Sequence, residues 1–318
     1  MTLPSTASPG PVLQLLAQRF RSGSASAARD EKTGPVADAI RFLPGRTPLV
    51  LDSPHSGTHY PDDFRPSCPP GLLRQAEDTH VETLYDFAPD LGVAWLEALF
   101  PRSYLDANRS TGEIDAAMLD APWPGALVQD GGALAKVRLG KGLLWRCTDD
   151  GTPIYDRLLT VNEVQARIAR CWVPYHAALA QAIDAAHAAF GYSLHINCHS
   201  MPSVASAYST DFPGLVHPDF VVGDRDGTTA DARLSQRVCE YLRAQGYSVA
   251  YNHPYKGVEL VRSVGQPSKD RHSLQLEINR RLYMDETTLE KHEGFASLQQ
   301  TLKSLVTWLL AIDPRKPE

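Results

Sequence analysis

The sequence contains few cysteines and no excess of positive charge. Its 318 residues include five cysteines, an odd number that is widely spaced and forms no CxxC pair. This pattern argues against a disulfide scaffold or a cysteine-rich zinc site and favours a reducing cytoplasm. Lys and Arg number 31 against 37 Asp and Glu, a net charge of −6. A nucleic-acid-binding protein usually presents a basic face, so we expect no nucleic-acid partner.

Long apolar runs are also missing. The late apolar run at 305–312 contains Thr307 and is far shorter than the roughly 18 residues needed to cross a bilayer. The N-terminus shows no basic stretch followed by an apolar one, so no secretory signal is expected. We therefore predict a cytoplasmic protein without a membrane partner.

The first 45 residues are rich in Ser, Pro, Gly, Ala and Arg and show little periodicity. They are predicted to form a flexible N-terminal arm, with one short helix near 12–20. Residues 46–318 are predicted to form a single α/β domain. A Gly- and Pro-rich stretch around 110–155 is typical of a loop-rich insertion within that domain.

Short apolar runs alternate with helical patterns along the rest of the chain. Buried strands are predicted at 48–53, 193–198, 219–222, 247–251 and 273–278. Helices are predicted at 78–88, 161–191, 230–245 and 295–312, the second of them kinked or split by Pro174. This alternation predicts an α/β three-layer sandwich with a mostly parallel or mixed sheet.

Two histidines directly follow predicted strands. His55 lies in the segment DSPHSG after the first strand, and His199 lies in NCHSM after the second. Ligand crevices of α/β sheets lie beyond the carboxyl ends of strands, and neutral imidazole is the commonest metal ligand. The two side chains could converge on a metal, or each could be an ordinary polar residue of a turn. His195, four residues before His199, is expected to be a hydrogen-bonded core histidine.

Glu277 is a carboxylate within an apolar strand, a position that is costly unless the charge is paired or used. Strand alternation places Gln275, Glu277 and Asn279 on one face, which predicts a polar pocket wall. The alternative is a buried salt bridge from Glu277 to Arg280 or Arg281.

A catalytic zinc site needs three protein ligands and one open position. The acidic start of the predicted helix at 78–88 could supply the third ligand through Asp78 or His80. Residues two apart do not share a helix face, so both are not expected to bind one metal, and the helical phase does not choose between them. Carboxylates in this position often serve only as helix caps.

Basic side chains suited to carboxylate recognition lie near these segments. Arg109 closes the segment DANR after Asn108, Arg271 precedes the strand of Glu277, and Lys256 lies in a polar loop. Arg146 also lies in such a loop but is expected to be a solvated surface charge.

Nine segments between residues 45 and 290 together resemble the N-formylglutamate amidohydrolase (N-formylglutamate deformylase) family. The matching segments, in chain order, are LDSPHSGTHYP (51–61), DTHVETLYDFAPDLG (78–92), YLDANR (104–109), GLLWR (142–146), PIYDRLLTVNEVQARI (153–168), PYH (174–176), NCHSM (197–201), NHPYKG (252–257) and LQLEINRRLYM (274–284). Each segment alone is weak, but their succession is specific.

The resemblance implies a zinc-exopeptidase-like fold of the phosphorylase/hydrolase type and a role in histidine degradation. It makes His55, Asp78 and His199 the expected ligands of Zn²⁺ or another divalent metal, with Asp78 preferred over His80. Glu277 takes the general acid/base role. Arg109 is expected to bind a substrate carboxylate or the oxyanion, and Asn108, Arg271 and Lys256 are expected to contribute to substrate binding.

The resulting hypothesis is metal-dependent hydrolysis of N-formyl-L-glutamate to formate and L-glutamate. One alternative is a zinc amidohydrolase acting on another N-acyl amino acid or on a peptidoglycan-type amide, although no export signal favours the latter. A phosphoesterase is disfavoured because no second Asp and His cluster suggests a two-metal site. A non-catalytic metal- or ligand-binding protein on the same fold also remains, although such a protein needs no base at Glu277.

Overall fold

The computed structural model describes residues 39–207 and 212–316. The short helix predicted near 12–20, and most of the predicted arm, lie outside these ranges. None of the helices in the described ranges is both long and apolar enough to cross a membrane.

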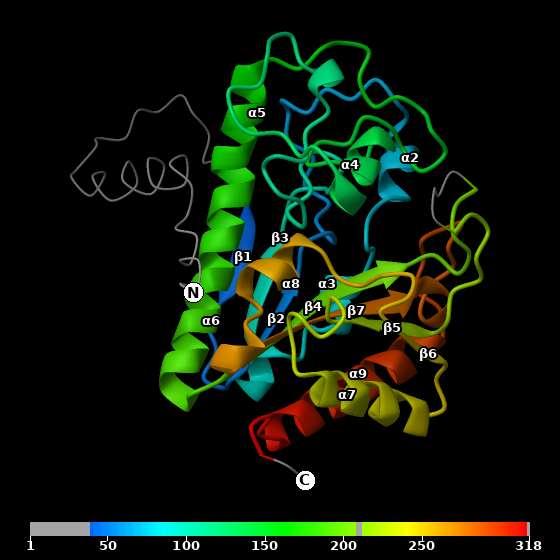
Figure 1. Cartoon of the computed structure of the whole chain (residues 1–318). Coiled ribbons are helices and arrows are strands. Elements are labelled where there is room, and N and C mark those ends of the chain that lie inside the picture. The colour runs from blue at the N-terminus through cyan, green and yellow to red at the C-terminus, as the bar shows by residue number, and fades with distance from the viewer. Residues whose placement is uncertain (1–38, 208–211, 317–318) are drawn as a thin grey trace, which may run out of the picture. The chain divides into compact units, whose positions relative to one another are not determined.

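The described residues form one mixed sheet in the order β1-β3-β2-β4-β7-β5-β6 (Figure 1). Strands β3, β2, β4 and β7 run parallel to one another. Strand β1 pairs antiparallel with β3, and β5 pairs antiparallel with β7 and parallel with β6. The strands are β1 (Ile40–Leu43), β2 (Leu49–Ser53), β3 (Ala94–Ala98), β4 (Ser193–Met201), β5 (Phe220–Gly223), β6 (Val249–Tyr251) and β7 (Arg271–Asn279). All five predicted strands are present, and the predicted α/β class is confirmed.

Helices cover both faces of this sheet, as expected for a three-layer sandwich. Helices α6 and α8 pack on one face, whereas α3, α7 and α9 share the core on the other (Figure 1). The α-helices are α2 (Pro70–Arg74), α3 (Val81–Leu84), α4 (Gly131–Arg138), α5 (Val161–Arg167), α6 (Val173–Phe190), α7 (Ala232–Ala244), α8 (Glu259–Val264) and α9 (Gly294–Ala311). The other helical turns are η1 (Pro89–Leu91), η2 (Ala116–Met118), η3 (Ile168–Trp172), η4 (Pro267–Lys269) and η5 (Arg280–Leu282).

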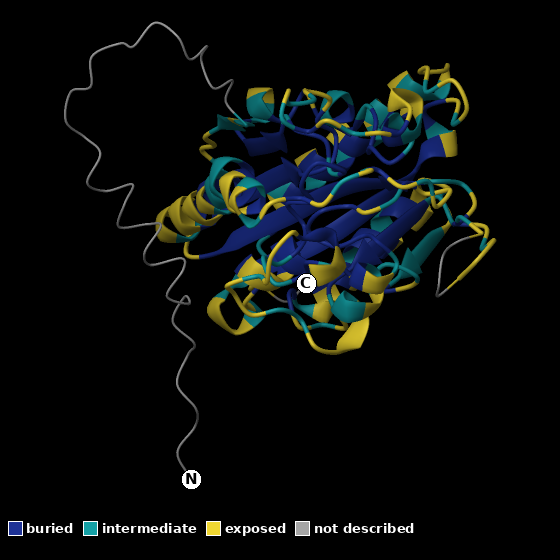
Figure 2. Ribbon diagram, turned by 90° about the horizontal axis from the view of Figure 1, so that it is seen from above, coloured by how far each residue is buried: buried dark blue, intermediate teal, exposed yellow. Residues whose placement is uncertain are grey.

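Two separate apolar cores result from the alternation of side chains across the strands. The strands themselves are almost wholly buried, and exposed residues lie on the outer sides of helices and in loops (Figure 2). The core under α6 and α8 contains Val50 and Leu96, and the opposite core contains Leu51, Ile196 and Leu276. Since both faces are covered, any polar residue on a central strand is also buried.

Two strands lie where the sequence did not predict them. Residues of β1 pair with β3, from Ile40 opposite Ala98 to Leu43 opposite Trp95, so the folded part begins before Arg46 and the predicted arm boundary at residue 45 is wrong. This strand is only half buried, which explains its weak apolar signal. The sequence of β3, AWLEA, consists largely of good helix formers, but burial on both faces makes it a strand.

The predicted helices are present with different lengths. The helix predicted at 78–88 is reduced to α3, because His80 takes a left-handed conformation with φ 69° and delays the start of the helix. The kink or split predicted at Pro174 appears earlier, as the π-helical turn η3 that joins α5 to α6 and ends two residues before this proline. Within 110–155 the structure contains η2, α4 and isolated β-bridges.

Candidate metal and catalytic site

One face of β4 and β7 is polar although it is buried. On β4 this face carries His195, Asn197 and His199, all less than 4% exposed. The parallel register sets His199 opposite Glu277 on β7. The predicted polar face therefore extends across two adjacent strands up to their carboxyl ends.

The structure brings His55, Asp78 and His199 together in one buried cluster. The Nδ1 atoms of His55 and His199 lie 3.3 and 3.0 Å from the same Oδ2 atom of Asp78. One potential ligand atom from each residue lies within 4.8 Å of the others. His80 lies elsewhere, with its Nε2 2.8 Å from the carbonyl oxygen of Leu289. Of the two residues left open by the sequence, Asp78 is the one in the cluster.

The loops after the strands bring these side chains together. Strand β2 runs parallel to β4, so the segment with His55 leaves the sheet at the same edge as His199. The amide of Asp78 donates a hydrogen bond of 3.1 Å to the carbonyl of His55. A side chain at Gly57 would collide with the backbone carbonyls of Ala98 and Phe100, so only glycine allows the loop after His55 to pass the end of β3.

His55 is held by a carboxylate on its other ring nitrogen. Its Nε2 lies 2.7 Å from Oδ1 of Asp106, an oxygen that also accepts a hydrogen bond from the amide of Asn108. This contact places the imidazole proton on Nε2. The buried Nδ1 atom has no hydrogen-bond partner. An unpaired ring nitrogen beside a carboxylate, backed by a second carboxylate, is the usual arrangement of a metal-binding histidine.

The side-chain amide of Asn197 orients the ring of His199. Its Nε2 lies 2.6 Å from Oδ1 of Asn197, and Nδ2 of Asn197 donates to Asp52 at 2.8 Å. A proton on Nε2 would bond the Asn197 oxygen and leave the lone pair of Nδ1 facing Asp78, although Nδ2 of Asn108 also lies 3.2 Å from Nε2. Burial, opposed mainly by Asp78, lowers the pKa of His199, which favours the neutral ring.

The charges in this cluster fit a bound cation. If both imidazole protons lie on Nε2, the lone pairs of two nitrogens face the carboxylate of Asp78, an arrangement that a bound cation would stabilise. Burial alone would raise the pKa of Asp78, but His199, His55 and Arg102 hold it well below its usual value. The cluster is therefore a possible metal-binding triad.

Glu277 lies beside this triad as a buried carboxyl group. Burial, and then the charge of Asp78, raise its pKa well above the usual value. Its Oε1 accepts a hydrogen bond of 2.8 Å from Nε2 of Gln275. The alternative partners are occupied elsewhere, since Arg280 donates to the carbonyl of Glu77 at 2.7 Å and Arg281 pairs with Asp219 at 2.8 Å.

The segment with Asn108 and Arg109 lies against the triad. Nδ2 of Asn108 lies 3.4 Å from Oδ1 of Asn197, and its Oδ1 accepts the amide of Leu260 at 2.9 Å. Arg109 pairs with Glu113 at 3.3 Å, while its Nε is buried without a hydrogen-bond partner. Its guanidinium is one of the charges that lower the pKa of Asp106, which places it near the cluster.

A stacked pair on the long helix anchors the backbone of this segment. Trp172 and His176 stack with ring centroids 3.7 Å apart. The Trp172 indole donates to the carbonyl of Arg109 at 2.8 Å, and Nε2 of His176 lies 2.8 Å from the carbonyl of Ala107. Trp172 is the last residue of the π-helical turn η3, a feature that recurs at functional sites.

Two predicted substrate-binding residues lie away from the triad. Arg271 is the first residue of β7, six positions and about 20 Å along the strand from Glu277, and pairs with Asp184 at 2.6 Å. Its assignment to the same pocket is wrong, because it lies at the opposite end of the strand. The exposed Lys256 side chain pairs with Asp226 at 2.8 Å, so its role stays a prediction.

Comparison with known proteins identifies the family. Residues 47–284 match the N-formylglutamate amidohydrolase family model. The chain belongs to this family. It is 31% identical over 286 residues to the N-formylglutamate deformylase of Pseudomonas putida, covering 85% of this chain and 96% of that protein. The deformylase of Pseudomonas aeruginosa is 29% identical over 289 residues, covering 85% and 97%. The family resemblance inferred from the motifs is confirmed.

Solved structures agree with this membership. The crystal structure of N-formylglutamate amidohydrolase from Ralstonia eutropha JMP134 aligns with a TM-score of 0.80 and 47% identity, covering 86% of this chain and 98% of that one. A gene product of Agrobacterium tumefaciens aligns with a TM-score of 0.61 at 15% identity, covering 86% and 94%. The latter likeness concerns the fold alone.

In this member of the amidohydrolase family, three residues near the triad were not predicted as site residues, although Arg280 was considered as a salt-bridge partner of Glu277. Arg102 lies 3.1 Å from Asp106 and 3.6 Å from Asp78, and Arg280 lies 3.5 Å from Asp78. Asp106 belongs to the same DANR segment as Arg109, so the motif contained its signal. Arg102 precedes Asp106 by four residues, a spacing typical of helical ion pairs, but no helix was predicted there.

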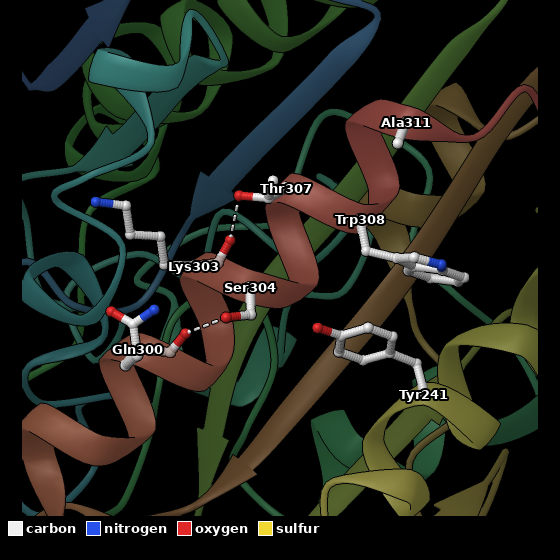
Figure 3. Close-up of a pocket in the computed structure, with 7 residues that line it drawn as sticks. All are labelled: Tyr241, Gln300, Lys303, Ser304, Thr307, Trp308 and Ala311. Atoms are coloured by element: carbon white, nitrogen blue, oxygen red, sulfur yellow. Dashed lines mark hydrogen bonds between the residues drawn. The ribbon is translucent and has the colours of Figure 1, made fainter.

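A surface hollow between α7 and α9 lies away from this site (Figure 3). Tyr241 and Trp308 stack there with ring centroids 4.9 Å apart. The hydroxyls of Ser304 and Thr307 bond the carbonyls one helical turn earlier. The hollow is lined by Tyr241, Gln300, Lys303, Ser304, Thr307, Trp308 and Ala311, a set without acidic, histidine or cysteine side chains.

Proposed function

We propose that this chain hydrolyses N-formyl-L-glutamate to formate and L-glutamate. Membership of the N-formylglutamate amidohydrolase family supports the reaction class. The observation that carries the proposal is the position of Glu277, a buried carboxyl group directly opposite His199 on the neighbouring strand. A three-ligand cluster with an adjacent carboxyl group fits metal-assisted amide hydrolysis better than passive metal binding.

The metal proposed for this site is Zn²⁺. His55 and His199 would bind it through Nδ1 and Asp78 through Oδ2, the atoms that already point at one another. Two imidazoles, one carboxylate and a fourth position left for water or substrate are typical of catalytic zinc. When bound, the ion would supply Lewis acidity, polarising the formyl carbonyl and lowering the pKa of the attacking water.

Glu277 is proposed to move the proton. As a general base its carboxylate would accept a proton from the attacking water, and as an acid it would return that proton to the departing amine nitrogen. A carboxyl group with a raised pKa can hold a proton between these steps. The hydrogen bond from Gln275 would hold Oε1 in place while Oε2 exchanges the proton.

Cationic side chains would bind the charges of the substrate and of the oxyanion. N-formyl-L-glutamate carries two carboxylates, and a guanidinium can bind a carboxylate through two hydrogen bonds. Arg109, with Asn108 beside it, is proposed to bind the α-carboxylate. Arg102 lies 3.6 Å from Asp78, and its charge would stabilise the oxyanion formed at the carbonyl.

The proposal is tested by formate release from N-formyl-L-glutamate, with N-formyl-L-aspartate as comparator. Zinc-replete protein should release formate from the glutamate compound, and chelator-treated protein should not until zinc is restored. The two substrates differ by one methylene, which is worth only about 1–3 kcal/mol of discrimination. Failure to release formate from either compound, with zinc content near one per chain, would overturn the proposed reaction and direct attention to longer N-acyl amino acids.

A further inference from the structure

The substrate proposed above carries a side-chain carboxylate that still needs a binding group. Arg271 lies at the far end of β7, and Lys256 pairs with the exposed Asp226. Lys141 is a third cation, which the sequence did not single out. It belongs to the loop-rich segment 110–155 and is only 9% exposed.

Lys141 is a buried ammonium whose carboxylate partner is largely in solvent. Its Nζ donates to the carbonyl of Cys147 at 2.9 Å and pairs with Asp149 at 2.9 Å. The Asp149 side chain is 48% exposed, against 11% for that of Lys141. Burial lowers the pKa of Lys141, although Asp149 opposes this effect. The ammonium has therefore lost much of its hydration and depends on a carboxylate for compensation.

An aromatic ring links Lys141 to the candidate active site. Nζ of Lys141 lies 3.6 Å from the centroid of the Trp145 ring, and the guanidinium carbon of Arg102 lies 5.0 Å from the same centroid. Arg102 in turn contacts Asp78 and Asp106. Lys141 is thus one aromatic side chain away from a residue that touches the triad.

The charge of Asp149 also acts on residues near the candidate active site. The Asp149 carboxylate is close enough to Arg102 to interact with its charge. It contributes, after burial and Glu277, to the raised pKa of Tyr255. A carboxylate at this position lies near both Arg102 and Tyr255, and Tyr255 lies near Glu277.

Two buried donors in this group lack a partner. Neither Nε1 of Trp145 nor Nε of Arg102 has a hydrogen-bond partner, although buried donors in proteins are almost always paired. An anion that entered beside the ammonium would find two donors that the protein leaves unpaired.

We propose that Lys141 binds the side-chain carboxylate of the substrate, in the place that the Asp149 carboxylate holds in the free protein. In this exchange the substrate carboxylate takes the place of the Asp149 carboxylate on the Lys141 ammonium, and Asp149 turns toward solvent. A neutral substrate side chain cannot pair with the ammonium. It would have to fit beside Asp149 or displace it and leave the ammonium unpaired. The Lys141–Asp149 pair therefore selects dicarboxylic N-formyl amino acids. This inference rests on the proposed function.

Comparison of charged and neutral substrates tests the subsite. N-formyl-L-norvaline carries a methyl group where glutamate has its side-chain carboxylate. In Lys141→Met, kcat/KM for N-formyl-L-glutamate should fall about 10- to 100-fold, whereas the value for the norvaline compound should change less than about threefold. Lys141→Arg should recover part of the loss, and Lys303→Met, a matched change on α9, should change neither substrate. Equal losses on both substrates, or no loss on either, would overturn the proposal.

Asp149→Asn provides a second test that spares the buried lysine. Removal of the competing carboxylate should lower KM for N-formyl-L-glutamate several-fold, while a purely structural ion pair predicts a higher KM. This variant decides the question if Lys141→Met fails to fold or if the norvaline compound is not turned over. Wild-type protein that releases no formate from N-formyl-L-glutamate would count against the proposed reaction, whereas active protein with the wrong variant pattern would count against the subsite alone.

Discussion

The two faces of β4 and β7 are equally buried but chemically opposite. Toward α3, α7 and α9 the strands present Leu194, Ile196, Cys198, Leu274, Leu276 and Ile278. Toward α6 and α8 they present His195, Asn197, His199, Ser273, Gln275 and Glu277. The apolar face needs only complementary volume, whereas each group on the polar face needs a partner of the right chemistry. The comparison shows how one pair of strands supports both the core and the candidate site.

Asp52 is the central acceptor on the polar face. It accepts hydrogen bonds from Tyr175 at 2.7 Å and from Asn197 at 2.8 Å, and its Oδ1 lies 2.8 Å from Nε2 of His195. His195 in turn lies 2.7 Å from the hydroxyl of Ser273 through its Nδ1. The core role predicted for His195 is therefore confirmed, and the network ends at His199.

The largest difference in activity between variants of the two faces is expected at Glu277 and Ile278, neighbouring positions of β7. Glu277→Gln should lower kcat about 10²- to 10⁴-fold, because the amide cannot accept and return a proton. Zinc content and the melting temperature should change little. Ile278→Val, on the opposite face, should leave kcat unchanged. Steady-state kinetics with N-formyl-L-glutamate give the comparison, and near-normal kcat in Glu277→Gln would remove Glu277 from the mechanism.

The next contrast concerns Asp78 and His80, two residues apart in the chain. Asp78→Ala should weaken zinc binding at least about 100-fold, since loss of a ligand should exceed the effect of losing a supporting contact. His80→Ala should have little effect, because its ring bonds the carbonyl of Leu289. Competition with a chromophoric chelator measures both affinities. The reverse order would transfer the ligand role to His80.

A smaller contrast is expected within β4. Asn197→Ala removes the acceptor that fixes the ring of His199 and should weaken zinc binding about 10- to 100-fold. Ile196→Ala should instead lower the free energy of unfolding by about 2–5 kcal/mol through the cavity it leaves, with zinc affinity retained. Chelator competition and urea unfolding on each variant separate the two effects. If both variants lost stability and zinc affinity in proportion, Asn197 would be structural only.

Local pattern accounts for the parts of the fold that the sequence predicted. The central strands were predictable because they are short apolar runs, and the alternation of LQLEIN located Glu277 on its polar face. In contrast, AWLEA in β3 has helix-forming residues, and only pairing with β1 and β2 makes it a strand. The shortened α3 depends on the left-handed backbone of His80, which no periodicity indicates.

The candidate site was most predictable where a side chain lies in or directly after a strand near its carboxyl end. His55 and His199 could be proposed because parallel strands end at one edge of a sheet. Arg102 and Lys141 could not, because their neighbours are set by loops whose course depends on distant contacts. Arg271 was misplaced for a related reason, since proximity to Glu277 in the sequence becomes distance along an extended strand.

The smallest expected effect is a pH dependence of the free energy of unfolding that arises from Asp52 on the polar face. Burial alone would raise the pKa of Asp52, but His195, Asn197 and Tyr175 lower it below its usual value. A carboxylate with a lowered pKa in the folded state contributes stability that is fully present above its unfolded pKa, about 3.9. That contribution is lost as the pH falls through the folded value. Asp52→Asn should therefore lower the free energy of unfolding by about 1–3 kcal/mol at pH 6.

The difference between Asp52→Asn and the wild type should shrink as the pH falls below about 4, because the wild-type carboxyl group becomes protonated as well. Urea unfolding of both proteins between pH 6 and 3 measures it. Ile196→Ala is the matched control on the opposite face, and its deficit should stay constant over the same range, since no titrating group is lost. A pH-independent deficit in Asp52→Asn would mean that shape, rather than charge, is what Asp52 contributes to the polar face.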